Sequence, residues 1–168
     1  EYKEVIQTVR QESAIMGVNI DDAAEAVGAL YSQMAGFTDL SKDTQREVAS
    51  FTAEMAQLGV ATDVTAGLLD SGTKSLGMTT DEAMKMSKEV AQAARDLGMP
   101  VSQMSADLKA AMPQLAAYGK EAVKVFKGVA AAAKATGIAT GDLLSITEQF
   151  DTFQQAAESV GRLNGILG

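Results

Sequence analysis

Glycine followed directly by an apolar residue recurs along the chain and divides it into segments of helical length. The pairs are Gly17-Val18, Gly59-Val60, Gly77-Met78, Gly98-Met99 and Gly137-Ile138, and a Thr, Ser or Asp follows each within a few residues. A glycine just after a helix adopts the left-handed conformation that closes the last turn, and the apolar residue folds back onto that turn. The hydroxyl or carboxylate then caps the next helix. The pattern therefore predicts helices joined by tight glycine turns.

The spacing of these turns is regular once two weaker breaks, Gly36-Phe37 and Tyr118-Gly119, are included. Each unit is then roughly twenty residues long, which is one helix of about four turns with a short loop. Within the units apolar residues step by three and four positions, as in amphipathic helices, and no stretch alternates like a half-buried strand. The longest such row comprises Leu143, Ile146, Phe150, Phe153, Ala157 and Val160. We therefore predict an all-α fold, an array or bundle of about eight short amphipathic helices.

Four residues set expectations for individual helices. Thr79, with a glutamate three positions later, predicts a capping box at the start of one helix. Pro113 lies inside a helical pattern and is expected to bend or break that helix just before it. Gly67 and Gly72 predict that the helix over 62–76 is the weakest, because each glycine costs about 1 kcal/mol relative to alanine.

The length of 168 residues suits one medium domain with its own core. The chain begins with Glu1 rather than Met and stops at Gly168 in mid-pattern. We therefore expect residues 1–168 to form a single all-α domain that is a piece of a longer protein. The candidate point for a subdivision is Gly98-Pro100.

Composition excludes several classes of function. Lys and Arg total 14 against 22 Asp and Glu, and the net charge of -8 repels phosphate backbones, so we expect no specific nucleic-acid binding. The absence of cysteine and histidine excludes disulfides, thiolate or His-ligated metal sites and Ser-His-Asp catalysis. Uncharged stretches stay well short of the about 20 residues that a bilayer needs, so no membrane span is expected.

Residues 67–75 come close to a phosphate-binding loop. That motif requires two glycines followed directly by Lys and a hydroxyl residue, but Thr73 is inserted before Lys74. No apolar strand precedes the segment either. We therefore interpret it as a loosely formed helix.

Asp39, Ser41 and Asp43 have the spacing of the first three ligands of a calcium loop. The glycine expected next is Thr44, and the position of the bidentate glutamate is Ser50. The segment is therefore interpreted as a loop and a helix N-cap around Ser41.

Lys120, Lys124 and Lys127 lie on one face of a predicted helix, which is either a docking strip for an acidic partner or a solvated face. The nine methionines and the alanine blocks mark either an adaptable binding groove or ordinary core. Both pairs of alternatives stay open at this point.

Carboxylates near the longest apolar row are the remaining candidates for acid-base chemistry. They are Glu148, Asp151 and Glu158, and no pattern in the sequence supplies a pocket around them. We therefore name no catalytic, cofactor-binding or metal-binding residue and do not expect an enzyme. A deep pocket that brings together carboxylates, lysines or Tyr118 would instead support the hypothesis of an all-α enzyme.

The glycine turns also carry a resemblance to a known family. Leu58-Gly59-Val60-Ala61-Thr62, Leu76-Gly77-Met78-Thr79-Thr80 and Leu97-Gly98-Met99 resemble turns in the helical segments of bacteriophage tail tape measure and related internal tail proteins. The closest stretch is 137–168, GIATGDLLSITEQFDTFQQAAESVGRLNGILG. The resemblance covers most of the chain loosely and the last thirty residues more closely.

This resemblance implies a multi-copy helical protein inside the virion tail that is made in the host cytoplasm. Members of the family occupy the tube lumen, set the tail length and leave ahead of the genome. Their partners are copies of themselves and the tail tube, baseplate hub or terminator proteins. Because this chain breaks its helices so often, it suits a folded terminal or embedded domain better than the measuring rod. The family has no diagnostic motif, so no functional residue is carried over.

The leading interpretation is a non-enzymatic structural and assembly protein that acts through helix packing and forms homo-oligomers. The residues expected to make its contacts, on the terminal face of the array, are Phe150, Phe153, Val160 and Leu163. The alternative is a soluble bacterial helical adaptor or regulatory protein-interaction module.

Overall fold

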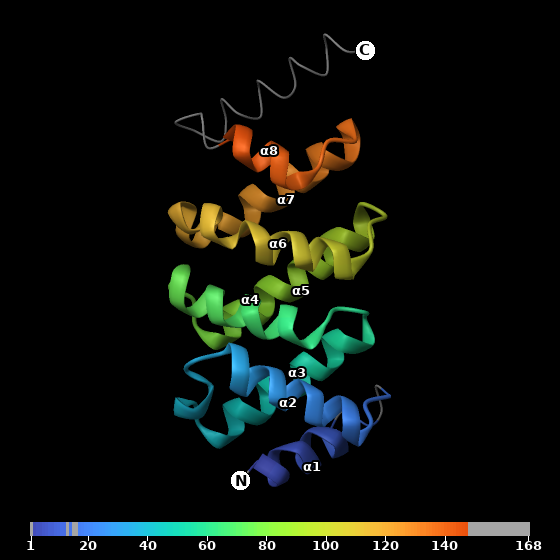
Figure 1. Ribbon diagram of the computed structural model, residues 1–168, viewed down its shortest axis with the longest axis vertical. Coiled ribbons are helices and arrows are strands. Elements are labelled where there is room, and N and C mark those ends of the chain that lie inside the picture. The colour runs from blue at the N-terminus through green and yellow to red at the C-terminus, as the bar shows by residue number, and fades with distance from the viewer. Residues whose placement is uncertain (1, 13, 15–16, 148–168) are drawn as a thin grey trace.

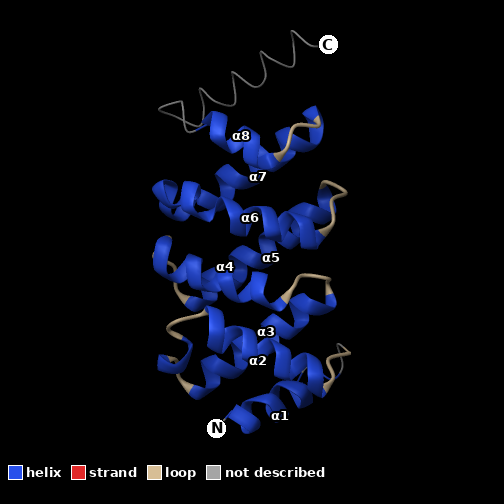
Figure 2. Cartoon of the chain, in the orientation of Figure 1, coloured by secondary structure: helices blue, strands red, loops and turns tan. Residues whose placement is uncertain are grey.

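The computed structural model describes residues 2–12, 14 and 17–147, and this part of the chain consists of helices and short turns (Figure 2). The α-helices are α1 (Tyr2–Glu12), α2 (Ile20–Gln33), α3 (Lys42–Gln57), α4 (Thr62–Ser75), α5 (Thr80–Asp96), α6 (Val101–Leu115), α7 (Ala122–Thr136) and α8 (Thr140–Thr147). Two 3-10 helices, η2 (Phe37–Asp39) and η3 (Ala116–Glu121), connect α2 to α3 and α6 to α7. The predicted all-α class is confirmed, and the number of helices is close to the eight expected.

The helices form an extended two-layered stack rather than a closed bundle (Figure 1). We call α2, α4, α6 and α8 the even layer, and α1, α3, α5 and α7, which lie behind it in Figure 1, the odd layer. Each helix packs mainly against the next helix in the chain and the one after that. As a result, α1 and α8 lie at opposite ends of the stack.

Two apolar clusters run along the stack and share α4 and α5. The first is built mainly from α1 to α4 around the fully buried Leu30 and Phe37. The second extends from α4 to α8 around Leu108 and Phe126, and it joins residues on both sides of Gly98-Pro100. The buried methionines are Met34, Met55, Met86, Met104 and Met112. These side chains fill the core, which favours the core interpretation of the methionines over the binding-groove one.

The glycine turns have the predicted conformation. The five glycines are Gly17, Gly59, Gly77, Gly98 and Gly137, with φ between 63° and 86°. At the second turn the N–H of Val60 donates to the carbonyl of Met55 at 3.1 Å, and Val60 is only 1% exposed. The apolar residue therefore folds back onto the helix as expected. Ile138 differs, because its side chain is 37% exposed.

The structure tests the expectations for Thr79 and Pro113. The Thr79 hydroxyl accepts from the Glu82 N–H at 3.2 Å and the Glu82 carboxylate accepts from the Thr79 N–H at 2.7 Å, so the capping box is confirmed. Of the bend or break expected at Pro113, the break is wrong, because α6 continues through it to Leu115. Proline removes one N–H and crowds one carbonyl a turn earlier, and burial of Met112 and Leu115 in the core offsets that loss. The chain turns instead in η3, where Gly119 has a φ of 52°.

A buried glutamine holds the connection between α2 and α3. Gln45, which is 5% exposed on α3, donates from Nε2 to the carbonyls of Phe37, Thr38 and Leu40 at 3.1, 3.4 and 3.2 Å. The Phe37 carbonyl also accepts from the Leu40 N–H that closes η2 at 3.3 Å, so the glutamine amide adds a second donor there and supplies side-chain contacts to the carbonyls of Thr38 and Leu40. The loop is therefore fixed by a side chain from the following helix.

Gly72 of α4 allows α5 to approach closely, and Gly67 leaves room for the Lys109 side chain of α6. A Cβ atom on Gly72 would lie 3.0 Å from Cβ of Ala83 on α5, and one on Gly67 would lie 2.7 Å from Cε of Lys109 on α6. The helix is continuous from Thr62 to Ser75 in spite of both glycines. Its low intrinsic propensity is therefore offset by packing on α2, α5 and α6.

We expect Gly72→Ala to destabilise the protein by about 1 kcal/mol, although alanine is the better helix former. Crowding of α5 costs about 1–3 kcal/mol, and the gain in helix propensity returns about 1 kcal/mol. Chemical denaturation measures the change. The control is Gly141→Ala in α8, where no atom lies within 4 Å of the added Cβ and the free energy of unfolding should rise or stay level. A similar gain from both substitutions would contradict close α4–α5 packing.

Candidate interaction groove

The odd layer opens between α3 and α5. In the even layer α4 contacts both α2 and α6 extensively, and in the odd layer α1 contacts α3 to a similar extent, whereas α3 and α5 meet at few positions. Two hollows of about 510 and 650 Å³ lie end to end along this gap. Both are lined by Phe51, Glu54 and Lys88, so we treat them as one feature, the α3–α5 groove.

The floor of the groove is apolar. Phe51 and Met55 from α3 and Ala91 from α5 are 2–3% exposed there, and Leu58 at the end of α3 is 44% exposed. The Nζ atom of Lys88 lies 5.4 Å from the centre of the Phe51 ring. This cation–π contact places a charged side chain over the largest apolar group of the floor.

The two walls of the groove carry opposite charges once two ion pairs are set aside. Arg46 on α3 pairs with Asp43 at 3.1 Å, and Glu89 on α5 pairs with Lys127 at 3.2 Å. On α3, Glu47 and Glu54 are seven residues apart, which places them on one face of the helix. On α5, Lys88 and Arg95 have the same spacing. Within the described part of the chain, neither glutamate forms an ion pair with either of these cations. The groove therefore has an acidic wall and a basic wall that do not neutralise each other.

In the neighbouring gap of the odd layer, on the other side of α5, acidic and basic side chains form ion pairs that close the gap. Lys120 donates to Glu82 at 2.9 Å, and Lys127 donates to Glu89 at 3.2 Å. The two lysines are seven residues apart along the chain, and so are the two glutamates. The lysine row seen in the sequence thus binds acidic side chains of the same molecule, and Lys124 lies 3.5 Å from a glutamate one turn away.

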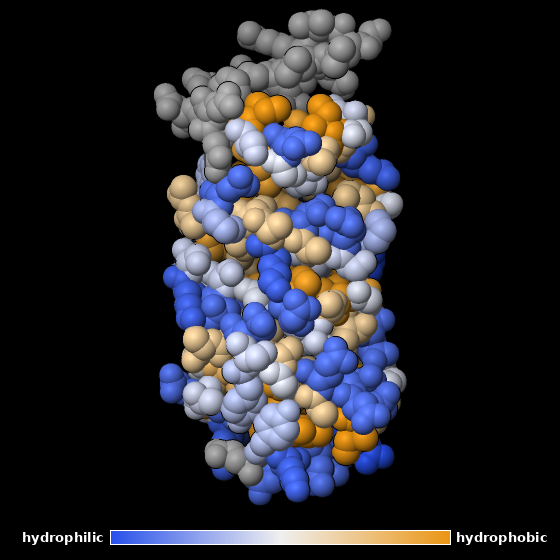
Figure 3. Space-filling model, viewed as in Figure 1, coloured by the Kyte–Doolittle hydropathy of each residue, from blue (hydrophilic) through white to orange (hydrophobic). Residues whose placement is uncertain are grey.

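Polar contacts also join successive helices of the even layer. They are Thr62 to Glu25 (3.0 Å), Lys109 to Asp63 (3.0 Å) and Thr140 to Asp107 (3.4 Å). The first and third are equivalent, because each joins a threonine in the first turn of one helix to a carboxylate of the preceding even helix. Figure 3 shows this side of the stack, where hydrophilic and apolar residues are interspersed. The even layer is therefore locked by both apolar and polar contacts.

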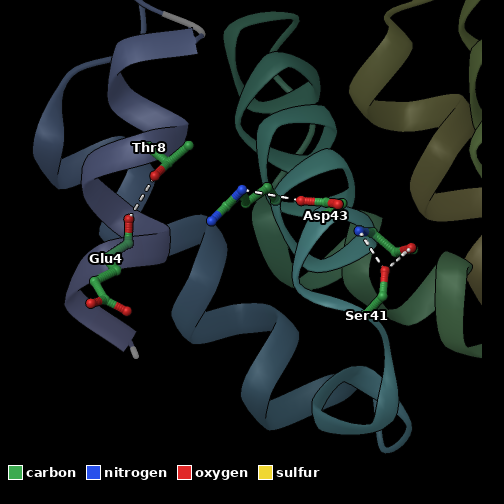
Figure 4. Close-up of polar contacts among 6 residues, drawn as sticks. Glu4, Thr8, Ser41 and Asp43 are labelled. Carbon is green, nitrogen blue, oxygen red and sulfur yellow. Dashed lines mark hydrogen bonds and ion pairs between the residues drawn. The ribbon is translucent and has the colours of Figure 1, made fainter.

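The two near-motifs of the sequence have structural roles. Residues 67–75 belong to α4, so their backbone amides serve the helix rather than a phosphate. Ser41 caps α3 by accepting from the Thr44 N–H at 3.2 Å, and Asp43 pairs with Arg46 at 3.1 Å (Figure 4). Among the described residues no group of three or more acidic side chains is placed to hold a metal ion.

The contact residues predicted from the sequence, Phe150, Phe153, Val160 and Leu163, lie outside the described residues. Glu148, Asp151 and Glu158 lie there as well. The groove was not found from the sequence. The sequence does contain a pattern that marks it: two glutamates seven residues apart on α3 and two basic residues seven residues apart on α5. This pattern indicates a groove only when α3 and α5 are known to be neighbours.

Comparison with protein-family models, with curated proteins and with solved structures finds no match to the chain. No helix within the described ranges is both long and apolar enough to cross a bilayer.

The contact between Glu82 and Lys120 predicts a measurable pKa change. The backbone N–H of Thr79 is the largest cause that lowers the pKa of the Glu82 carboxyl, and the hydrogen bond from Lys120 is the next. In Lys120→Met we expect this pKa to rise but to stay below its ordinary value, because the Thr79 contact remains. Carboxyl-carbon NMR titration of the parent and variant measures it.

The same shift fixes the sign of the pH effect on stability. Because the folded-state pKa of Glu82 is lowered, its contribution is present above the unfolded pKa and is lost as the pH falls through the folded pKa. Lys120→Met should raise the folded-state pKa of Glu82 and so narrow the acidic pH range over which this contribution to stability is lost. The control is Lys124→Met, which should leave the pKa of Glu82 as it is. An unchanged pKa in Lys120→Met would mean that the ion pair between Glu82 of α5 and Lys120 of η3 does not form in solution.

Proposed function

We propose that this chain is a non-enzymatic structural and assembly protein that works by packing its helices against other proteins. The observation that carries the proposal is the two-layered stack with an apolar, charge-lined groove on its odd layer. Stacked helical hairpins present long surfaces to partners, and their chemistry lies in those surfaces rather than in a buried reactive centre. Copies of the chain itself are among the proposed partners.

The finer proposal is an internal protein of a bacteriophage tail, a part of a tape measure or a related protein. It rests on the sequence resemblance of the glycine turns and of residues 137–168 to that family. The proposed partners are the tail tube, the baseplate hub and the terminator. The proposed location is the tail interior, after assembly in the host cytoplasm.

The stacked geometry supports a folded domain of such a protein rather than its length-measuring rod. A straight helix gains 1.5 Å per residue, so about forty residues span about 60 Å. In this stack a helix pair of similar length adds about one interaxial distance, roughly 10 Å. A ruler built this way would use several times more chain per unit of tail length.

The alternative is a bacterial adaptor or regulatory module that binds one partner. The observation that favours it is the groove itself, because its open form is found between α3 and α5 whereas the equivalent gap between α5 and α7 is closed by ion pairs. A single specialised groove suits one specific partner. The flanking sequence of the full-length protein separates the two proposals, since a tail protein should continue into long alanine-rich helices.

We expect peptides of this chain in tails purified from the phage whose genome encodes it, at several copies per particle. Quantitative mass spectrometry of intact particles measures them. Particles that have ejected their genome should have lost these peptides, whereas tail-tube peptides should remain and serve as the internal control. Peptides confined to the soluble fraction of infected cells would contradict the tail location and favour the adaptor.

A further inference from the structure

We propose that the α3–α5 groove binds an amphipathic α-helix of a partner protein, with basic residues on the flank that faces α3 and acidic residues on the flank that faces α5. This inference rests on the proposed function as a protein-binding scaffold and names the chemistry of the partner. The bound helix would lie along the odd layer, between two helices that now contact each other at few positions.

The length of the groove matches a helical segment. Its lining residues on α3 run from Asp43 to Leu58, which is about four helical turns or about 22 Å. A helix of about fifteen residues has the same length. An elongated hollow of this kind receives an amphipathic helix through its apolar face, with side chains three and four residues apart as anchors.

The apolar floor supplies the area that such a helix would cover. Leu58 is the most exposed apolar side chain of the floor, and Met84 of α5 is half-buried at the other end of the groove. Phe51 lies between these ends, beneath the Lys88 ammonium group. Binding would exchange the contact of Lys88 with the ring for an ion pair with an acidic residue of the partner.

The charges of the walls define the flanks of the partner. Glu47 and Glu54 on α3 attract basic side chains, whereas Lys88 and Arg95 on α5 attract acidic ones. The ion pairs of α5 with Lys120 of η3 and Lys127 of α7 show that lysines seven residues apart pair with glutamates seven residues apart in this layer. A partner helix with the stated flanks would repeat that contact on both walls.

The test uses the whole chain and a synthetic, fluorescein-labelled helix of about fifteen residues. It carries leucine at the core heptad positions, lysine along one flank and glutamate along the other. A second peptide of the same composition alternates lysine and glutamate on both flanks. We expect fluorescence anisotropy to show binding of the first peptide at least about tenfold tighter than the second, because only the first places opposite charges against both walls.

Two variants of the groove and two matched controls assign the binding to it. Glu54→Lys and Lys88→Glu should each weaken binding of the first peptide about tenfold, since each places like charges together. Glu121→Lys and Lys124→Glu make the same changes of charge at exposed residues outside the groove and should leave the affinity unchanged. Circular dichroism confirms that each variant is folded as the parent is.

Three outcomes would overturn the inference. They are an absence of binding by the parent chain, equal affinity for the two peptides, and equal effects of Glu54→Lys and Glu121→Lys. Sedimentation in which Glu54→Lys abolishes self-association would also overturn it, because the occupant would then be a second copy. If the chain is found in phage particles but the peptide does not bind, the proposed groove is refuted and the proposed function is not. If the peptide binds but the chain is absent from phage particles, the tail location is refuted and the proposed groove is not.

Discussion

The structure depends on short helices that gain their stability by packing. Isolated helices shorter than about 12–15 residues are marginal in water, and of α1 to α8, which span 8 to 17 residues, only α3 and α5 are longer than that range. Each must therefore bury its apolar stripe against others. The chain satisfies this by packing every helix on the next one and on the one after it. Contacts that stay this local in sequence produce a stack that lengthens with each helix instead of closing on itself.

The contrast between the contacts of α4 and the contact of α3 with α5 follows from the side chains that meet there. α4 presents Gly72 to α5, which approaches it closely, and polar contacts join the even helices in sequence. On the odd-layer side of α5 charged side chains are present instead. Lys127 of α7 pairs with Glu89 of α5, whereas the charges of α3 and α5 remain apart. The groove is thus a consequence of the sparse packing between α3 and α5.

Local structure was predictable from the sequence because its causes are local. Gly98 closes a helix and Thr79 opens one through contacts with residues only a few positions away. Pro113 shows the limit of that reasoning, since the helix around it is held by the burial of Met112 and Leu115 against other helices. The choice between bundle and extended stack, and the partners of Lys120 and Lys127, depend on which helices become neighbours. No local pattern determines that, and so the groove became visible only in the fold.

The extended stack is tested most directly by a distance between its two ends. Spin labels at Gln7 on α1 and Asp142 on α8, both exposed, would report it by pulsed electron paramagnetic resonance. Three steps of about 10 Å between the first and the last helix pair predict a separation of at least about 30 Å. The control pair, Ala110 and Asp142, lines one hollow between α6 and α8 and should be closer than about 20 Å. A Gln7–Asp142 distance as short as that of the control would contradict the stack and indicate a closed bundle.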